Sequence, residues 1–483
     1  MMGGEAGGMA DTLAPDICVI GAGPGGLSAA AAAAALGVPT VLIERETMGG
    51  DSLNTGSVPS KALLAAAKRA EAIRGAAVFG LDVQNIRVNF ANVSEHVQSV
   101  VTAVKPAYSM ERFTGLGVRV IRAHAQFKDA RTVTAGDFEI RARRFVIAAG
   151  SRPTIPAIAG LDGGPFLTSE TIFELKERPE HLIIVGAGSV GLELAQAFRR
   201  LGSSVTVLEA ARPLAGDDAE CVDIVLDRLE REGVVIRGDV NVVGVTYVGG
   251  TVTAAIEIAG AEQTITGSHL LVAVGRMPAL DGVNLDAAGI RHDHSGIVVD
   301  RKLKTTNARV YAIGDCVAGQ APLANAVEYQ AGLVVRNALF RMPIRFDGTM
   351  VPRATYTEPE LAQAGFTEAQ AQAAGMKIRI ARWPYNDNDR AQTERDTRGH
   401  IKIITTAKGK IVGATIVGAQ ASELIGMWAL AIGQGLTIRA FADIVLPYPT
   451  LSEIGKRAAI DCFGPSLTGS WVRRIIGWMR IFG

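Results

Sequence analysis

Cysteine is scarce in this chain, whose 483 residues contain only Cys18, Cys221, Cys316 and Cys462. No two of them have the C-x-x-C spacing, which argues against a disulfide scaffold and a zinc site and is typical of a reducing compartment. An excess of charge of one sign is also missing, because the formal net charge is +1. A polyanionic partner such as nucleic acid is therefore not expected.

Charged residues are absent between Ile17 and Ile43, a stretch long enough to cross a bilayer. The stretch holds five glycines and two prolines, and it divides into a strand, a Gly-rich loop, an Ala-rich helix and a second strand. We interpret the missing charge as burial of both faces of a parallel sheet, not as a membrane span. Residues 1–10 lack the basic and apolar regions of a signal peptide, and we expect them to form a disordered lead-in.

Glycine, in contrast, is abundant, with 55 residues, and it forms the motif G-x-G-x-x-G twice. The motif occupies Gly21, Gly23 and Gly26, with an acid at Glu44, and then Gly186, Gly188 and Gly191, with an acid at Glu209. The glycines permit a tight turn, close approach of a pyrophosphate and close packing of helix on strand, and the acid binds a ribose. The second unit repeats the first with one offset of 165 residues. We expect two dinucleotides, one held tightly and one that exchanges.

The acid of the second unit indicates which nicotinamide nucleotide binds there. A carboxylate at Glu209 accepts a hydrogen bond from the 2′-hydroxyl of NADH and repels the 2′-phosphate of NADPH. Arg212 lies nearby in the sequence and weakens that preference. The sequence therefore predicts NADH in preference to NADPH.

Residues 49–61, GGDSLNTGSVPSK, follow the first unit and resemble the active-site segment of the flavoprotein disulfide reductases. That family includes dihydrolipoamide dehydrogenase, glutathione reductase and mercuric reductase, and its pattern is GG-x-C-x-x-x-x-C-x-P-[ST]-K. Gly50 and Lys61 match the pattern, whereas Ser52 and Ser57 stand at the positions of the two redox cysteines. By the resemblance, Lys61 pairs with Glu193 beside the flavin, where a cation would stabilise the anionic reduced ring.

Other segments extend the resemblance over roughly residues 12–465. Residues 145–153 and 270–280 resemble the family's crossings between its FAD and NAD domains, with Gly150 and Gly275 at their turns. Residues 305–316 resemble its second FAD motif, in which Asp315 binds the ribityl–phosphate region. The resemblance implies an α/β fold with FAD and NADH as cofactors. The implied fold has two Rossmann-like domains and a C-terminal α+β dimerisation domain, through which two chains form a homodimer.

The expected domains follow the order of these motifs. They are an FAD-binding domain in two parts (12–155 and 278–350), an NAD-binding domain (156–277), a dimerisation domain (351–465) and a basic amphipathic segment (466–483). His292 and His294 are expected in a turn between two strands and not in a metal site, because no other Cys or His lies close by in sequence.

A second departure from the family lies in residues 446–459. Lipoamide- and glutathione-type reductases carry H-P-T-x-x-E there, and the histidine is the proton donor to the departing thiolate. Here Tyr448 takes that position, with Glu453 as the acid, and none of the seven histidines lies beyond His400. Tyrosine at this place resembles the mercuric reductases, but their C-terminal cysteine pair is missing, and Hg(II) needs soft thiolate ligands.

Serine cannot replace the redox cysteines chemically, because its hydroxyl is not ionised near neutral pH and forms no exchangeable disulfide. We therefore expect a cytoplasmic FAD-dependent NAD(P)H oxidoreductase with a non-thiol acceptor such as a quinone, a dye or oxygen. Two alternatives stay open. One is a disulfide or mercuric reductase-type enzyme inactivated by engineered serines, and the other is a non-catalytic flavoprotein that senses NADH or binds a partner.

The last residues form a basic amphipathic pattern. Trp471, Ile475, Trp478 and Phe482 have helical spacing, and Arg473, Arg474 and Arg480 flank them. Such a helix can lie on a membrane surface or pack on the dimer. We expect packing on the dimer, with peripheral membrane contact through 470–483 as the alternative.

Overall fold

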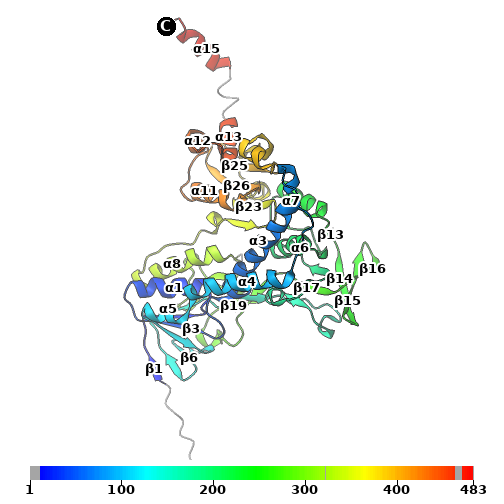
Figure 1. Cartoon of the computed structure of the whole chain (residues 1–483). Coiled ribbons are helices and arrows are strands. Elements are labelled where there is room, and N and C mark those ends of the chain that lie inside the picture. Colours follow the sequence, from blue (N-terminus) through cyan, green and yellow to red (C-terminus); the bar gives the residue numbers. More distant parts are fainter. Residues whose placement is uncertain (1–10, 321–322, 463–469, 482–483) are drawn as a thin grey trace, which may run out of the picture.

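The computed structural model describes residues 11–320, 323–462 and 470–481, which form three lobes and one outlying helix (Figure 1). Two lobes contain a parallel sheet and the third contains an antiparallel sheet. Residues 1–10, the expected lead-in, lie outside the described residues. Within the described ranges, no helix is both long and apolar enough to cross a bilayer.

The first lobe is built on a parallel five-stranded sheet in the order β21-β8-β2-β3-β4. Its strands are β2 (Ile17–Ile20), β3 (Thr40–Glu44), β4 (Val118–Arg122), β8 (Arg144–Ile147) and β21 (Val310–Ala312). Helices α1 (Pro24–Ala35) and α8 (Ala324–Phe340) pack on each other beside it. Every residue of β2 and β3 is buried, so the stretch without charge is covered by protein on both faces of the sheet.

A smaller sheet completes the first lobe. It contains β1 (Asp11–Leu13), β5 (Ala125–Asp129), β6 (Thr132–Ala135) and β7 (Phe138–Ile140). Helix α5 (Met110–Gly115) precedes β4. Strand β21 belongs to this lobe but follows the second lobe in the sequence. The first lobe is therefore made of two separate parts of the chain.

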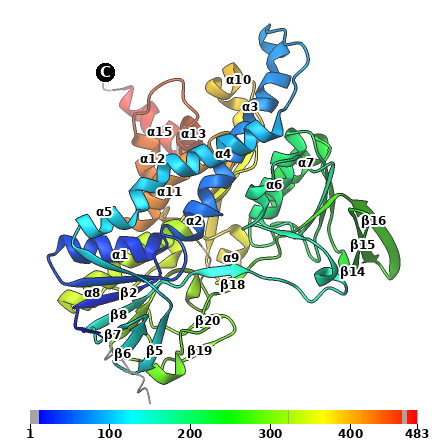
Figure 2. The ribbon, with the colours of Figure 1, turned by 60° about the horizontal axis from the view of Figure 1, so that its bottom comes forward.

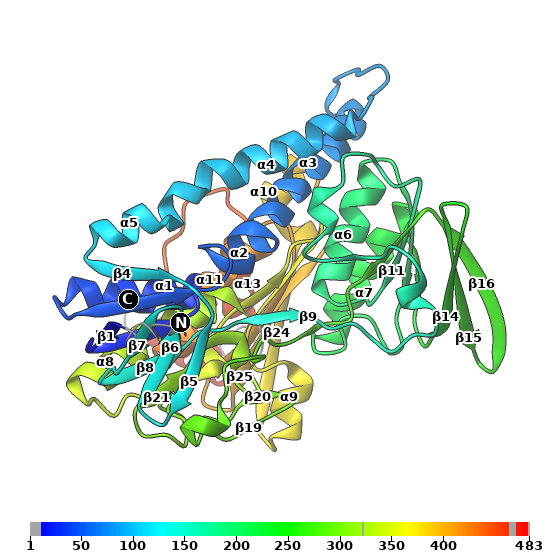
Figure 3. The same cartoon turned by 90° about the horizontal axis from the view of Figure 1, so that it is seen from below.

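The second lobe repeats the parallel design in the order β10-β17-β11-β12-β13. Its strands are β10 (Leu167–Thr168), β11 (His181–Val185), β12 (Ser204–Leu208), β13 (Val235–Arg237) and β17 (His269–Val272), with helices α6 (Ser189–Arg200) and α7 (Ala219–Arg231). An antiparallel sheet of β14 (Asn241–Val248), β15 (Thr251–Ile258) and β16 (Ala261–Gly267) forms its outer edge (Figure 3).

Two short strands connect the lobes. β9 (Ser151–Pro153) leaves the first lobe, β18 (Arg276–Pro278) returns from the second, and the two pair antiparallel. Further on, β19 (His292–Asp293) and β20 (Gly296–Ile297) form a hairpin with His294 in its turn. The expected turn between two strands is confirmed for His294, whereas His292 lies in strand β19 itself.

The third lobe is an antiparallel sheet in the order β22-β23-β26-β25-β24 with helices on it. Its strands are β22 (Arg353–Thr355), β23 (Glu360–Gly365), β24 (Ile378–Pro384), β25 (His400–Thr406) and β26 (Ile411–Gly418). Its helices are α9 (Glu368–Ala373), α10 (Asp389–Glu394), α11 (Ala421–Gly433), α12 (Arg439–Asp443) and α13 (Glu453–Asp461). Trp428 stacks on Phe441 at 3.9 Å between ring centroids and fills the core between α11 and α12.

Long helices hold the three lobes together. α2 (Gly50–Asn54) leads into α3 (Ser57–Arg74), which packs along α4 (Phe90–Val104) on one side and α6 on the other (Figure 2). Buried side chains from all three helices share one core. The expected α/β architecture of two dinucleotide-binding domains and a C-terminal α+β domain is confirmed, whereas the residue boundaries between the domains stay a prediction.

Candidate functional site: two dinucleotide cradles and the cavity between them

The two Gly-rich turns have nearly the same geometry. Gly21 and Gly186 have φ angles of +99° and +109°, which side chains with a Cβ rarely adopt. A Cβ on Gly26 would lie 1.8 Å from the carbonyl oxygen of Gly21, and one on Gly191 would lie 2.0 Å from that of Gly186. Only glycine therefore allows α1 and α6 to start so close to their strands. Gly23 and Gly188 face open space, where a pyrophosphate can approach the backbone.

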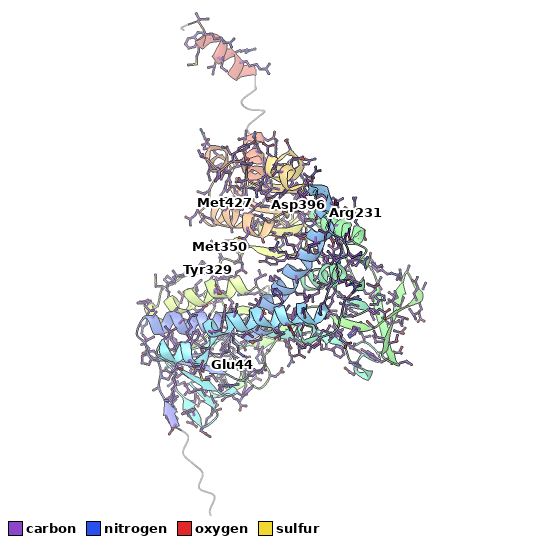
Figure 4. The ribbon with its side chains drawn as sticks, viewed as in Figure 1. Glu44, Arg231, Tyr329, Met350, Asp396 and Met427 are labelled. Atoms are coloured by element: carbon purple, nitrogen blue, oxygen red, sulfur yellow. The ribbon has the colours of Figure 1, made fainter. Side chains whose placement is uncertain are left out.

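The acids at the ends of β3 and β12 bind the turns in the same way. Glu44 Oε2 accepts a hydrogen bond from the backbone nitrogen of Ala22 at 2.6 Å, and Glu209 Oε2 accepts one from that of Ala187 at 2.7 Å. Each carboxylate oxygen keeps a lone pair for a ribose hydroxyl. Figure 4 places Glu44 in the first lobe. Both units thus have the parts that a dinucleotide requires.

An elongated space begins at the first turn. One cavity of about 450 Å³ is lined by Gly21, Glu44, Gly50 and Gly150 among others. A second cavity of about 560 Å³ extends to Lys61, Glu193, Gly275 and Asp315. Both cavities are lined by Gly23, Asp51 and Thr55, so the space is continuous. The combined volume of the two cavities, and the glycine turn and acid that line the first of them, fit an extended FAD.

An ion pair between a half-buried lysine and a buried glutamate lies in the wall of the second cavity. Lys61 Nζ, from α3, donates to Glu193 Oε2, from α6, at 2.8 Å. The other oxygen of Glu193 accepts from the backbone nitrogen of Tyr356 at 2.9 Å, and Lys61 Nζ lies 4.2 Å from the centroid of the Tyr356 ring. The glutamate side chain is only 6 % exposed, so its charge needs these partners. The ammonium is consequently fixed against the cavity, where it can stabilise negative charge.

A second charged group borders the same space. Ser151 Oγ donates to Asp315 Oδ2 at 2.6 Å and accepts from Arg276 Nε at 2.7 Å. Arg276 also lies 3.0 Å from Asp51 and 3.6 Å from Glu170. Burial raises the pKa of Asp315 above its usual range, and Asp51 raises it further against the opposing effects of Ser151 and Arg276. A hydroxyl-bearing ligand would find both a donor and an acceptor here.

Ser52 and Ser57 both line the second cavity, Ser52 on α2 and Ser57 at the first residue of α3. All four cysteines belong to the described residues, and none of them lines either cavity. Burial raises the pKa of the Cys316 thiol to about 12, and it also raises the pKa of Cys18 and Cys221. Those three thiols are therefore poor sources of thiolate near neutral pH.

Tyr448 and Glu453 do not reach the cavity in a single chain, because neither is among the residues that line it. Tyr448 is exposed in the third lobe, and its hydroxyl donates to Asp389. This hydrogen bond to a carboxylate raises the pKa of Tyr448. Any role of Tyr448 at a cavity thus requires a second subunit.

Models of known families cover nearly the whole described chain. Residues 15–332 match the pyridine nucleotide-disulphide oxidoreductase model, and residues 351–459 match the dimerisation domain of the same family. This chain belongs to the pyridine nucleotide-disulphide oxidoreductase family. FAD and NAD(H) are the cofactors typical of its relatives, and the dimerisation domain supports a homodimer.

The relatives include two kinds of enzyme. A dihydrolipoyl dehydrogenase of Bacillus subtilis is 36% identical over 93% of this chain and 96% of its own length. A mercuric reductase of Bacillus cereus is 33% identical over 93% of this chain and 71% of its own length. Among solved structures, LpdA of Mycobacterium tuberculosis has a TM-score of 0.85 at 27% identity, covering 93% of this chain and 99% of that one.

Sequence reasoning missed several residues of the site. No motif pointed to Tyr356, which holds Glu193 and Lys61. Asp51, Ser151 and Arg276 lie inside the segments 49–61, 145–153 and 270–280, but no role was assigned to them. Arg276 contacts the hydroxyls of Ser151 and Ser169 and the carboxylates of Asp51 and Glu170.

Proposed function

We propose that this protein is an FAD-dependent oxidoreductase that passes electrons from NADH to an acceptor that is not a thiol, such as a quinone, a dye or oxygen. The observation that carries the proposal is the pair Ser52 and Ser57 at the cavity, at the positions of the family's redox cysteines. No cysteine of the described chain lines that cavity. Bound FAD would supply the chemistry, because it accepts a hydride and releases the two electrons to a second substrate.

The residues around the cavity support the first half of this reaction. Lys61 places a fixed positive charge in the wall, and Glu193 keeps it in position at 2.8 Å. A preorganised cation lowers the free energy of a state in which negative charge develops nearby. The ring of Tyr356 lies 4.2 Å from the ammonium and contributes a cation–π contact. These residues are the proposed catalytic group.

The serines argue against the second half of the family reaction. A hydroxyl at Ser52 or Ser57 neither attacks a disulfide nor binds a soft metal ion at neutral pH. Thiol exchange with lipoamide, glutathione disulfide or Hg(II) therefore has no nucleophile in this cavity. Tyr448 of a partner subunit would also be a weaker proton donor than an imidazole near neutral pH.

NADH is the proposed nucleotide. The carboxylate of Glu209 occupies the place where NADPH would bring its 2′-phosphate. The one cation that we expected to weaken this preference is engaged elsewhere, because Arg212 Nη2 lies 2.7 Å from Asp223 Oδ1 and 3.2 Å from the carbonyl of Ala219. The negative charge of Glu209 is therefore the main charge expected at the ribose of the bound nicotinamide nucleotide.

Anaerobic titration with NADH tests the proposal. We expect one equivalent of NADH to reduce the flavin fully, with no long-wavelength thiolate-to-flavin charge-transfer band. The double variant Ser52→Cys with Ser57→Cys should consume a second equivalent, because it creates a redox pair. Uptake of two equivalents by the unmodified protein would mean that another redox centre exists and that the mechanism is wrong.

Steady-state turnover separates the proposal from its alternatives. NADH oxidation should accelerate when a small quinone is added, and lipoamide, glutathione disulfide and Hg(II) should have no effect. A protein that is reduced by NADH but not reoxidised by any acceptor would instead be a sensor. The coding sequence of the source gene decides whether the serines are natural or introduced.

A further inference from the structure

Helix α15 (Ser470–Met479) is the one helix of the described chain that lies outside the three lobes (Figure 1). It belongs to a segment with a distinct composition. After Cys462 the chain contains three arginines and no aspartate, glutamate or lysine, together with two tryptophans. Such a segment is cationic and apolar at once, which distinguishes it from the almost neutral remainder of the chain.

Arg473 and Arg480 lie on the side of the helix opposite to most of its apolar side chains, whereas Arg474 lies beside Trp478 and Ile476 beside Arg480. At 3.6 residues per turn, Arg473 and Arg480 are two turns apart on one side. Ile475, Trp478 and Met479 are three and four residues apart and gather on the other side. Phe482, which has the same spacing, lies outside the described residues, and the side chain of Trp471 is not described either.

The apolar side of α15 is exposed. Trp478 and Met479 are 64% and 61% exposed, and Ile475 and Ile476 are also open to solvent. Exposed apolar area of this kind costs free energy in water, at about 25 cal/mol per Å². The expected packing of this segment on a second subunit stays a prediction. The third lobe has its own exposed apolar side chains at Leu430, Val445 and Tyr448 for a second subunit.

We propose that α15 docks this protein on the surface of an anionic lipid bilayer, with the helix axis parallel to the membrane. The arginines would meet lipid phosphates, and the tryptophan, isoleucine and methionine side chains would enter the boundary between headgroups and acyl chains. A helix of 10 residues is about 15 Å long at 1.5 Å per residue, half of the bilayer core, so it lies on the membrane and does not cross it. This docking does not rest on the proposed function.

Co-flotation of the full-length FAD-containing protein with vesicles tests the proposal. We expect it to float with vesicles of equal parts phosphatidylcholine and phosphatidylglycerol and to stay behind with phosphatidylcholine alone. Each of Arg473→Gln and Arg480→Gln should lower the partition coefficient about fivefold, because one arginine near such a surface contributes about 1 kcal/mol. Salt at about 1 M should release the protein, since the Debye length falls to about 3 Å.

Variants on the two sides of α15 provide matched controls. Ile475→Asp should abolish flotation, whereas Gly477→Ala, which adds a methyl group into open space, should float as well as the unmodified protein. A chain without residues 470–483 should stay dimeric and keep its NADH–dye turnover but fail to float. Absence of flotation with phosphatidylglycerol vesicles, or equal flotation of the shortened chain, would overturn the proposal. Conversion of the shortened chain to a monomer in sedimentation would show that the segment is a subunit contact instead.

Discussion

The two dinucleotide-binding units have the same turn but different surroundings. Helix α1 begins beneath α8, because a Cβ on Gly25 would lie 2.2 Å from Val327 Cγ2. The matching residue of the second unit, at the same offset of 165, is Val190, which is 43% exposed and lines the cavity. Because α8 packs on α1 at this point and Val190 is open, we propose that the first unit holds its nucleotide more tightly than the second.

The helices of the two units also differ in their anchors. On α6, Gln196 and Arg200 bind the backbone and the carboxylate of Glu358 in the third lobe. The matching residues on α1 are Ala31 and Ala35, which can make no such bonds. The second unit is therefore held to the dimerisation domain by polar contacts, whereas the first is held within its lobe by close packing. Four changes, from the largest expected effect to the smallest, test this comparison.

Replacing the third glycine of each unit by alanine should separate the role of the first unit in FAD binding from the role of the second unit in NADH binding. Gly26→Ala should yield protein without FAD or fail to fold, because its Cβ would meet the Gly21 carbonyl oxygen at 1.8 Å. Gly191→Ala should keep FAD but slow its reduction by NADH about 100-fold, since a displaced α6 misplaces the nucleotide. Flavin absorbance and stopped-flow reduction measure the two effects. Gly115→Ala, in open space on α5, is the control, and loss of FAD from Gly191→Ala would contradict the comparison.

Removing the anchor of α6 should destabilise the second unit. Arg200 is 4% exposed and binds Glu232 at 2.8 Å as well as Glu358. Arg200→Met removes the arginine that Glu232 and Glu358 share and leaves Glu232 with Arg228 and Glu358 with Lys68, at a cost of up to about 3 kcal/mol. The thermal midpoint should fall clearly. Arg231→Met, at the exposed position labelled in Figure 4, removes only a surface pair with Asp227 and should cost below about 1 kcal/mol. Equal losses in both variants would refute the anchor.

Changing the acids should affect a different nucleotide in each unit. Glu209→Ala should narrow the preference for NADH over NADPH by about 1–3 kcal/mol, the range for a badly matched buried polar group. Glu209→Gln keeps a hydrogen-bond acceptor and removes the charge, so it separates repulsion from lost hydrogen bonding. Glu44→Ala should weaken FAD retention and leave the nucleotide preference unchanged. Ratios of kcat/KM for the two nucleotides measure the effect, and equal ratios in the unmodified protein would contradict it.

Mild acid should loosen the second unit before the first. Burial alone would raise the pKa of Glu358, but Arg200 and Lys68 outweigh it and hold this pKa below its ordinary 4.5. A folded-state pKa below the unfolded one means that the stabilisation is complete above about pH 4.5 and is lost as the pH falls through the folded value. Thermal midpoints measured from about pH 5 down to about pH 3 should fall less steeply in Glu358→Gln, which has no carboxylate to protonate. An unchanged slope would remove Glu358 from the anchor.

The local motifs could be predicted from the sequence because the residues that form each of them lie close together in it. The glycines and acids of both units, and the expected strands and helices around them, have their causes within about 30 residues of sequence. The pair Lys61 and Glu193 is separated by 132 residues, and it was found through the resemblance alone. Tyr356 was missed because its partner Glu193 lies in another lobe, 163 residues away. Ser151 was missed because its partner Asp315 comes from the second part of the first lobe, 164 residues away, a separation that no local pattern encodes.

The sequence by itself determined the two dinucleotide cradles, the family and the absence of cysteine at the active-site segment, because each depends on the identity of residues in short motifs. Tertiary structure decided that α8 packs against Gly25 of the first unit, whereas the matching Val190 of the second unit stays 43% exposed. It also decided that Tyr448 needs a second subunit to reach a cavity, and that the apolar side of α15 is exposed. These exposures and positions depend on how segments far apart in the sequence pack together. A local pattern of residues carries no information on that packing.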